Sequence, residues 1–150
     1  MTTQAQENFI SLEQVLGRDT TELSTATEGT FTTKTLGNIP YTSVDFEEYK
    51  AMKKACTKMV PNGTGGMTQD IDDDKLMIML IVEAVDKDKR STFTFRNGEL
   101  LKKIGKLTDE GAVKFLLKPG EIVNFAIAIQ NASGFGKKAQ EAASEAVKNS

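Results

Sequence analysis

The residues best suited to chemistry are four closely spaced aspartates: Asp70, Asp72, Asp73 and Asp74. Neighbouring carboxylates are the ligands that Ca²⁺ and Mg²⁺ prefer. A calcium loop of the EF-hand type starting at Asp70 would need glycine at its sixth position and glutamate at its twelfth, where this chain has Lys75 and Ile81. Carboxylates are also favoured at the positive end of a helix dipole. We therefore interpret the cluster as a helix start, with Asp70 as the predicted N-cap and no metal bound.

Two other motifs could support catalysis or phosphate binding. Cys56 is the single cysteine, and a catalytic thiol needs a nearby base or a lowered pKa. The chain has no histidine, and Cys56 falls on an apolar stripe, so we expect a small buried hydrophobic residue. The run from Gly63 to Gly66 lacks the Gly-Lys-Ser/Thr of a phosphate loop and predicts a flexible connector.

The composition disfavours several classes of function. Without histidine the chain lacks the usual general base at neutral pH and the common zinc ligand. Its 19 basic and 21 acidic residues give a net charge of −2, which predicts no binding to nucleic acid or to an anionic membrane. One cysteine and no signal-peptide pattern favour the cytosol, and the longest apolar run, residues 76–82, is too short to span a bilayer. We expect a protein without enzymatic activity or cofactor. A small carboxylate and metal enzyme is the weaker alternative, which a concave pocket at residues 72–74 would favour.

The N-terminal half predicts one hairpin and one helix. Residues 1–28 are polar and should be weakly ordered, apart from a short apolar helical stripe at residues 9–16 that ends at a glycine. Residues 31–35 and 39–44 alternate around a Gly-Asn turn, which predicts a β-hairpin. Asp45 and Glu48 form a capping pattern for a helix that we expect to continue as far as Pro61.

The C-terminal half predicts four helices. Residues 76–82 are apolar on every side, so their helix should be the buried centre of the domain, followed by an exposed charged loop at 86–90. Asn97 and Thr108 are expected to cap the next two helices. Pro119 should begin the last helix, which ends at Gly134 and Phe135. The predicted fold is α+β, mainly α: a small N-terminal β-hairpin packed on about five helices in one domain, residues 29–135, with an exposed tail at 136–150.

Four segments together carry a family resemblance: residues 46–58, residues 72–85, residues 117–121 with the sequence Leu-Lys-Pro-Gly-Glu, and residues 133–135 with the sequence Ser-Gly-Phe. Their order resembles the tail assembly chaperones of long-tailed phages and prophages of Gram-positive bacteria. The resemblance implies a non-enzymatic protein that acts in the host cytoplasm and is absent from the mature virion. It further implies that the protein holds the tape measure protein soluble and recruits tail tube subunits.

Apolar helix faces are the candidate surfaces for these partners, and a homo-oligomer could coat a long client through multivalent contacts. The candidate protein-contact residues are Tyr49, Met52, Cys56, Met59, Ile122, Phe125, Ile129 and Phe135. The same stripes could instead be core residues. The alternative function is a structural tail completion or connector protein that is retained in the virion, which a strand-dominated fold would favour.

Overall fold

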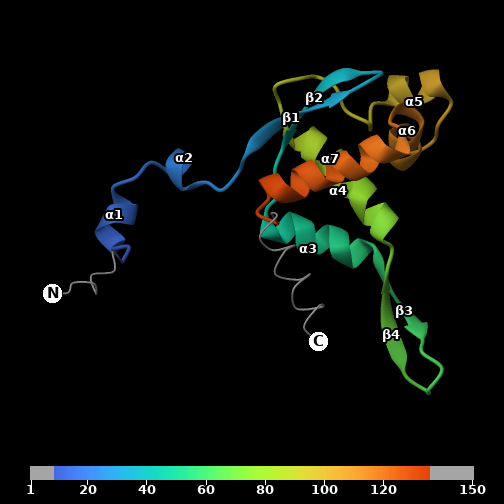
Figure 1. The fold of residues 1–150 in the computed structure, drawn as a ribbon, viewed down its shortest axis with the longest axis horizontal. Helices are drawn as coiled ribbons and strands as arrows, with labels where there is room; N and C mark the ends of the chain where they lie inside the picture. The colour runs from blue at the N-terminus through green and yellow to red at the C-terminus, as the bar shows by residue number, and fades with distance from the viewer. Residues whose placement is uncertain (1–8, 136–150) are drawn as a thin grey trace.

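The computed structural model describes residues 9–135, and in this part the chain forms helices with two small antiparallel sheets (Figure 1). The elements are α1 (Leu12–Leu16), α2 (Thr20–Leu23), β1 (Glu28–Thr33), β2 (Gly37–Thr42), α3 (Phe46–Ala55), β3 (Thr57–Pro61), β4 (Met67–Ile71), α4 (Asp73–Lys87), α5 (Gly98–Ile104), α6 (Asp109–Leu116) and α7 (Pro119–Ala132). The predicted class, α+β and mainly α with an N-terminal hairpin, is confirmed. The predicted exposed tail at 136–150 lies outside the described residues.

Helix α4 is the centre of the body, as its apolar sequence predicts. It contacts α3, α6, α7 and β2 (Figure 1). Its buried residues are Leu76, Ile78, Leu80, Ile81, Val82, Ala84 and Val85. The N-cap differs from the prediction: the side chain of Asp72, not Asp70, accepts a hydrogen bond from the Lys75 backbone N–H at 3.1 Å. The aspartates at 73 and 74 do occupy the first turn, where the helix dipole favours them.

The predicted N-terminal hairpin is present as β1 and β2, joined by a turn in which Gly37 takes a φ of 83°. Side chains on one face of this sheet pack on α7. The ring of Phe31 stacks on Phe125 with centroids 4.4 Å apart, and the ring of Tyr41 lies 5.5 Å from the same residue. Because an isolated hairpin is marginal in water, these contacts are what fix it to the body.

The other predicted caps are also found. Asn97 and Thr108 accept hydrogen bonds from the backbone N–H groups of the third residues of α5 and α6, at 2.9 and 3.0 Å. Glu121 accepts from the Lys118 N–H, and its second oxygen accepts from the Lys34 N–H in the hairpin turn, both at 2.8 Å. The start of α7 is therefore tied to the β1–β2 turn.

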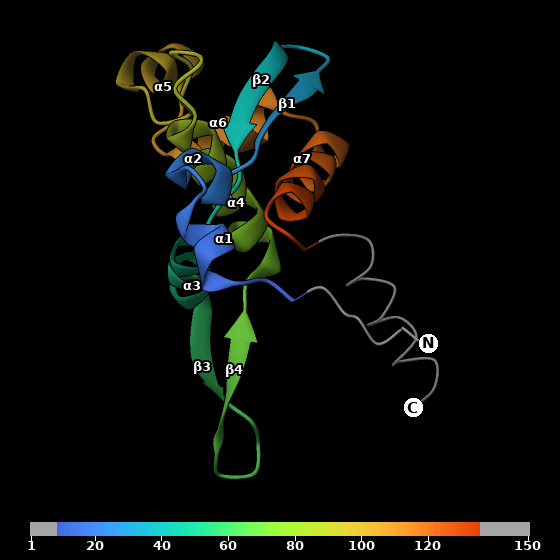
Figure 2. The same ribbon diagram turned by 90° about the vertical axis from the view of Figure 1, so that its left-hand side faces the viewer.

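The helix predicted from Asp45 to Pro61 is shorter than expected. It ends at Ala55, and the next residues form β3, which pairs with β4 in a second hairpin that the sequence analysis missed. Gly63 and Gly65 take positive φ values of 83° and 88° in the turn. Met59 is thus a strand residue, and the stripe from Tyr49 to Met59 is not one helix face. Figure 2 shows this β3–β4 hairpin projecting from the body.

The charged segment at 86–90 was predicted as an exposed loop, which is right for Lys89 and Arg90 and wrong for the first three residues. Helix α4 continues to Lys87, and Asp88 is buried at its C-terminal end. The Asp88 carboxylate accepts hydrogen bonds from the Thr42 hydroxyl at 2.9 Å and from Arg90 Nε at 3.0 Å, while Arg90 Nη2 donates to the Gly29 carbonyl at 2.6 Å. The segment ties α4 to the hairpin, a tertiary contact that local charge does not reveal.

Residues 9–23, here called the N-terminal arm, extend away from the body (Figure 1). The predicted short helix is present as α1, capped by Ser11 and ending at Gly17. The stretch from Asp19 to Glu28, which was expected to be weakly ordered, contains α2. The arm therefore carries local helical structure, and no residue of α1 or α2 is buried.

Candidate protein-contact surfaces

The part of the chain that the structure describes contains no group of three or more potential metal ligands. Of the four aspartates, Asp70 lies opposite Lys58 in the β3–β4 hairpin, whereas the other three are at the start of α4. Cys56 is buried with its Sγ 3.4 Å from Met79 Sδ, and burial raises the pKa of its thiol. A thiol with a raised pKa is a poor nucleophile.

The eight candidate contact residues divide by burial. The structure buries four of them: Met52, Cys56, Phe125 and Ile129. Tyr49 and Ile122 are partly buried against the core, whereas Met59 and Phe135 are exposed. Buried side chains pack the core and offer no surface to a partner while the chain is folded. Contact with a partner must therefore use other, exposed residues.

One exposed surface is an aromatic patch where α3 begins and α7 has ended. The ring of Phe135 lies 4.9 Å from Tyr49, and Phe46 is exposed on the adjoining turn. Lys50 places its Nζ 5.9 Å from the centre of the Phe46 ring. The patch is small and partly covered by its own lysine.

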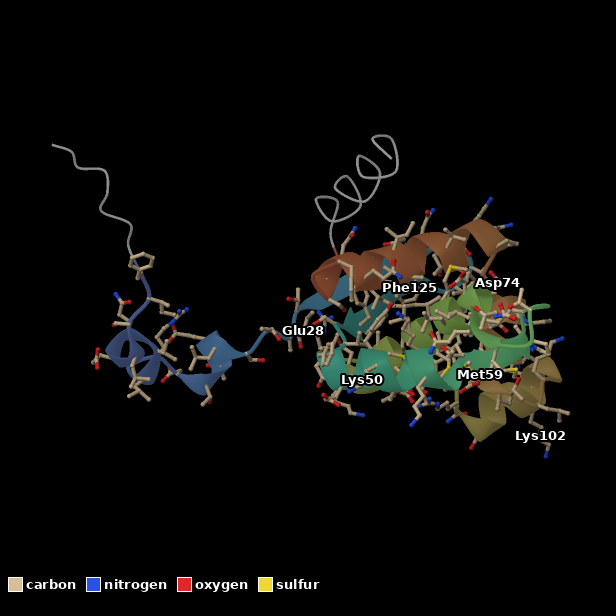
Figure 3. All side chains as sticks on the ribbon, turned by 90° about the horizontal axis from the view of Figure 1, so that it is seen from below. Glu28, Lys50, Met59, Asp74, Lys102 and Phe125 are labelled. Atoms are coloured by element: carbon tan, nitrogen blue, oxygen red, sulfur yellow. The ribbon has the colours of Figure 1, made fainter. Side chains whose placement is uncertain are left out.

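A second surface is one face of the β3–β4 hairpin. The register places Met59 opposite Gln69 and Pro61 opposite Met67, so these four side chains share a face, while Lys58 is on the other. Met59 and Met67 are 52% and 56% exposed. Figure 3 labels Met59 on the end of the body opposite the N-terminal arm. The sequence signal for this hairpin is the run of turn-forming residues between 61 and 67, which by itself predicts only a flexible connector.

A third surface is a groove of about 250 Å³ between α4, α6 and α7, here called the α4–α7 groove. Its lining residues are Asp74, Met77, Ile78, Lys114, Pro119, Ile122 and Val123. Ile127, one turn after Val123 on α7, is also exposed and continues this apolar surface. Asp74 is the single member of the aspartate cluster here, so the groove is apolar with one charge of each sign.

The fourth surface is the N-terminal arm. Its large apolar side chains are 39–79% exposed: Phe9, Ile10, Leu12, Leu16 and Leu23. The helix α1 is nevertheless well capped, since Ser11 Oγ accepts from the Gln14 N–H at 3.2 Å and Gln14 Oε1 accepts from the Ser11 N–H at 2.9 Å. The arm thus presents preformed apolar surface to solvent.

The sequence pattern of one protein family, the phage XkdN-like tail assembly chaperone proteins, matches residues 12–148. The chain belongs to this family. No curated protein and no solved structure matches it. The predicted family, the tail assembly chaperones, is confirmed. The Gram-positive host stays a prediction.

The match begins at the first residue of α1, so α1, α2, both hairpins and the helical body of the chaperone all lie within the matched region. A tail assembly chaperone acts on phage tail proteins, so its sites are protein-contact surfaces. Among residues 9–135, no helix has the length and apolarity that a bilayer crossing needs.

Proposed function

We propose that this chaperone binds the tape measure protein, keeps it soluble and recruits tail tube subunits to it. In this proposal it catalyses no reaction, acts in the host cytoplasm and leaves before the particle is complete. The observation that supports the proposal best is the projecting β3–β4 hairpin, because Met59 and Met67 lie on one of its faces and are both more than half exposed. A tape measure protein is long, helical and partly apolar before assembly, and it needs such surfaces to cover it.

The β3–β4 hairpin suits a client whose apolar residues vary along its length. Methionine is unbranched and adaptable, and surfaces rich in it can repack around different sequences. A two-stranded hairpin is only marginally stable alone, so a helix lying across Met59 and Met67 would stabilise both partners. Figure 2 shows the hairpin standing clear of the helices, where a long client can reach it.

Several copies acting together would make weak single contacts sufficient. A second copy bound near the first on the same client binds at high effective concentration, so the total affinity exceeds that of one contact by orders of magnitude. We therefore propose that the chaperone works as a homo-oligomer on its client.

The proposal is tested by co-expressing the chaperone with the tape measure protein and measuring how much client is soluble and co-purifies. The test variant carries Met59→Thr and Met67→Thr, since threonine retains strand propensity and removes the apolar surface. The control carries Lys58→Thr and Asp70→Thr, which face each other on the opposite side of the same hairpin. We expect a several-fold loss of soluble client with the methionine variant only. Equal recovery with both variants would contradict the proposal.

The alternative role, a structural protein retained in the virion, makes a different prediction. A completion or connector protein is a stoichiometric part of purified particles, whereas a chaperone should be depleted from them. Quantitative mass spectrometry of purified particles, normalised to the tail tube protein, separates the two. A fixed copy number per particle would replace the chaperone role by the structural one.

A further inference from the structure

The N-terminal arm presents large apolar side chains to solvent. Helices α1 and α2 lie apart from most of the body in Figure 1, and the last arm residue, Leu23, borders a hollow that Val44 and Lys87 also line. We propose that this arm, residues 9–23, docks into the α4–α7 groove of a second copy of the chain. The inference rests on the proposed homo-oligomer and names the element and the surface that join its copies.

The size of the arm suits an interface between copies. With areas of roughly 150–200 Å² for a large apolar residue, the observed exposed fractions leave on the order of 600 Å² of apolar surface on one arm. A standard protein interface buries about 800 Å² on each partner. The arm therefore supplies most of one side of such an interface, which is more apolar surface than a free segment normally exposes.

The arm and the groove also match in form. Leu12, Val15 and Leu16 of α1 are spaced at i, i+3 and i+4, the spacing with which an amphipathic helix fills an apolar groove. Phe9 and Ile10 precede the N-cap of this helix and add apolar surface beside it. The groove offers Met77 and Val123 between three helices. Because α1 is already capped and formed in the free arm, docking would cost less ordering entropy than docking of an unstructured segment.

The charges of the two surfaces are complementary. The charged residues of the arm are Glu13, Arg18, Asp19 and Glu22, and the groove carries Lys114 and Asp74. Lys114 can therefore meet an acid of the arm, and Asp74 can meet Arg18. The existing partners of Arg18 and Lys114 are exposed i,i+4 neighbours, and exposed pairs of this kind exchange at little cost.

The position of the arm favours a second copy over its own body. In Figure 3 the arm leaves the body beyond Glu28, whereas Asp74 of the groove lies at the other end of the molecule. The linker is fixed where it enters the body, because the Thr27 N–H donates to Ser43 Oγ and the Ser43 N–H donates to the Thr27 carbonyl, both at 2.8 Å.

The distance along α4 also favours docking on a second copy. Residues 24–26 of the linker border the same hollow as Lys87, at the C-terminal end of α4, and Asp74 is about 20 Å away at the helix rise per residue. The four linker residues 24–27 span at most about 14 Å. Docking on the same chain would therefore need α2 and the rest of the arm to fold back along the whole body.

The arm and the groove are different surfaces at opposite ends of the molecule, so the contact between two copies is heterologous. Each copy then donates its arm to one neighbour and accepts an arm from another, which gives an open line or a closed ring. Such an array would present the β3–β4 hairpins of successive copies to one long client.

The test uses the full-length chain without client and measures its mass by sedimentation over a range of concentrations. The arm variant carries Leu12→Ser and Leu16→Ser, and the groove variant carries Val123→Glu. All three positions are exposed, so both variants should fold, which circular dichroism verifies. The control is Leu107→Ser, a leucine that is 96% exposed elsewhere on the surface.

We expect the wild type and the control to self-associate with rising concentration, and each of the other two variants to associate at least tenfold more weakly. Mixing the arm variant with the groove variant should restore a 1:1 pair and nothing larger, because one intact arm then meets one intact groove. Wild-type chain that stays monomeric at every concentration, or an arm variant that associates normally, would overturn the proposal. Client solubilisation is measured separately, so normal self-association of the arm variant, with client binding retained, would remove this inference and leave the proposed function standing.

Discussion

At the scale of single residues, Asp88 is the one charged residue that is buried in the described part of the chain. Its carboxylate is fully enclosed and accepts hydrogen bonds from Arg90 and Thr42. The hydrogen bonds from the Arg90 side chain lower the pKa of Asp88, against the opposing effect of burial. The cluster joins the end of α4 to the β1–β2 hairpin, so its charge state should affect the stability of the whole body.

This arrangement predicts a pH dependence. Because the pKa of Asp88 is lower in the folded chain than in the unfolded one, its ionised form stabilises the fold above the unfolded value of about 3.9. That stability is lost as the pH falls through the lower, folded pKa. Asp88→Asn should reduce the free energy of unfolding by about 1.5–3 kcal/mol at pH 7 and make it less sensitive to acid. Urea unfolding at neutral pH and at about pH 3 measures both effects.

Glu28→Gln is the matched control, because the Glu28 carboxylate is exposed and lies 3.9 Å from the same arginine. An exposed pair at this distance contributes little, so the control should unfold like the wild type at both pH values. If the two variants behaved alike, the Asp88 cluster would not be the stabilising contact described here.

At the scale of elements, α7 separates a packing face from a solvent face. Phe125 is fully buried and contacts both strands of the β1–β2 hairpin through Phe31 and Tyr41, whereas Ile127, two residues later, is exposed. The two residues are on different sides of the helix because residues two apart are rotated by about 200°. The same helix thus contributes to the core and to the exterior.

The comparison of Phe125→Ala with Ile127→Ala tests this division. Removing the enclosed ring should cost about 3–5 kcal/mol, since it leaves a cavity beneath the hairpin. Removing the exposed isoleucine should cost less than about 1 kcal/mol. Chemical denaturation of both variants gives the two values. Similar losses for both would mean that α7 is not packed as described.

At the scale of the whole molecule, the β3–β4 hairpin is attached to the body at a narrow base. The Asp72 N–H donates to the Cys56 carbonyl at 2.8 Å, so the chain enters and leaves the hairpin at nearly the same place. Its two ends are therefore close enough to be joined by a short turn. The stability of the body should not depend on the hairpin, because the strand residues of the hairpin are all exposed or only half-buried.

Replacing residues 58–70 by a short glycine-containing turn should therefore leave the thermal unfolding midpoint within a few degrees of the wild type. The same deletion should abolish co-purification of the tape measure protein, because the Met59 and Met67 face is gone. Calorimetry and the co-expression assay measure the two outcomes. A deletion variant that unfolds or that keeps its client would contradict this separation of fold from contact.

The sequence predicted the parts of the fold that depend on neighbouring residues. Asp45, Asn97 and Thr108 were found as caps because a cap needs only a side chain and the next turn of backbone. The helix predicted to run to Pro61 was too long because apolar residues at 52, 56 and 59 fit helical spacing by coincidence, while strand pairing with residues 67–71 prevailed. Short apolar stretches are ambiguous in this way until their partner strand is known.

Sequence alone determined the mainly helical class, the central apolar helix and the chaperone family. These follow from local periodicity, from capping residues and from motifs that are contiguous in the chain. Only the tertiary structure decided which apolar residues are core and which are surface. The fold encloses Phe125 and Asp88 and leaves Met59 and most of the N-terminal arm in solvent. Burial depends on which distant segments pack against a residue, and a local sequence pattern does not contain that information.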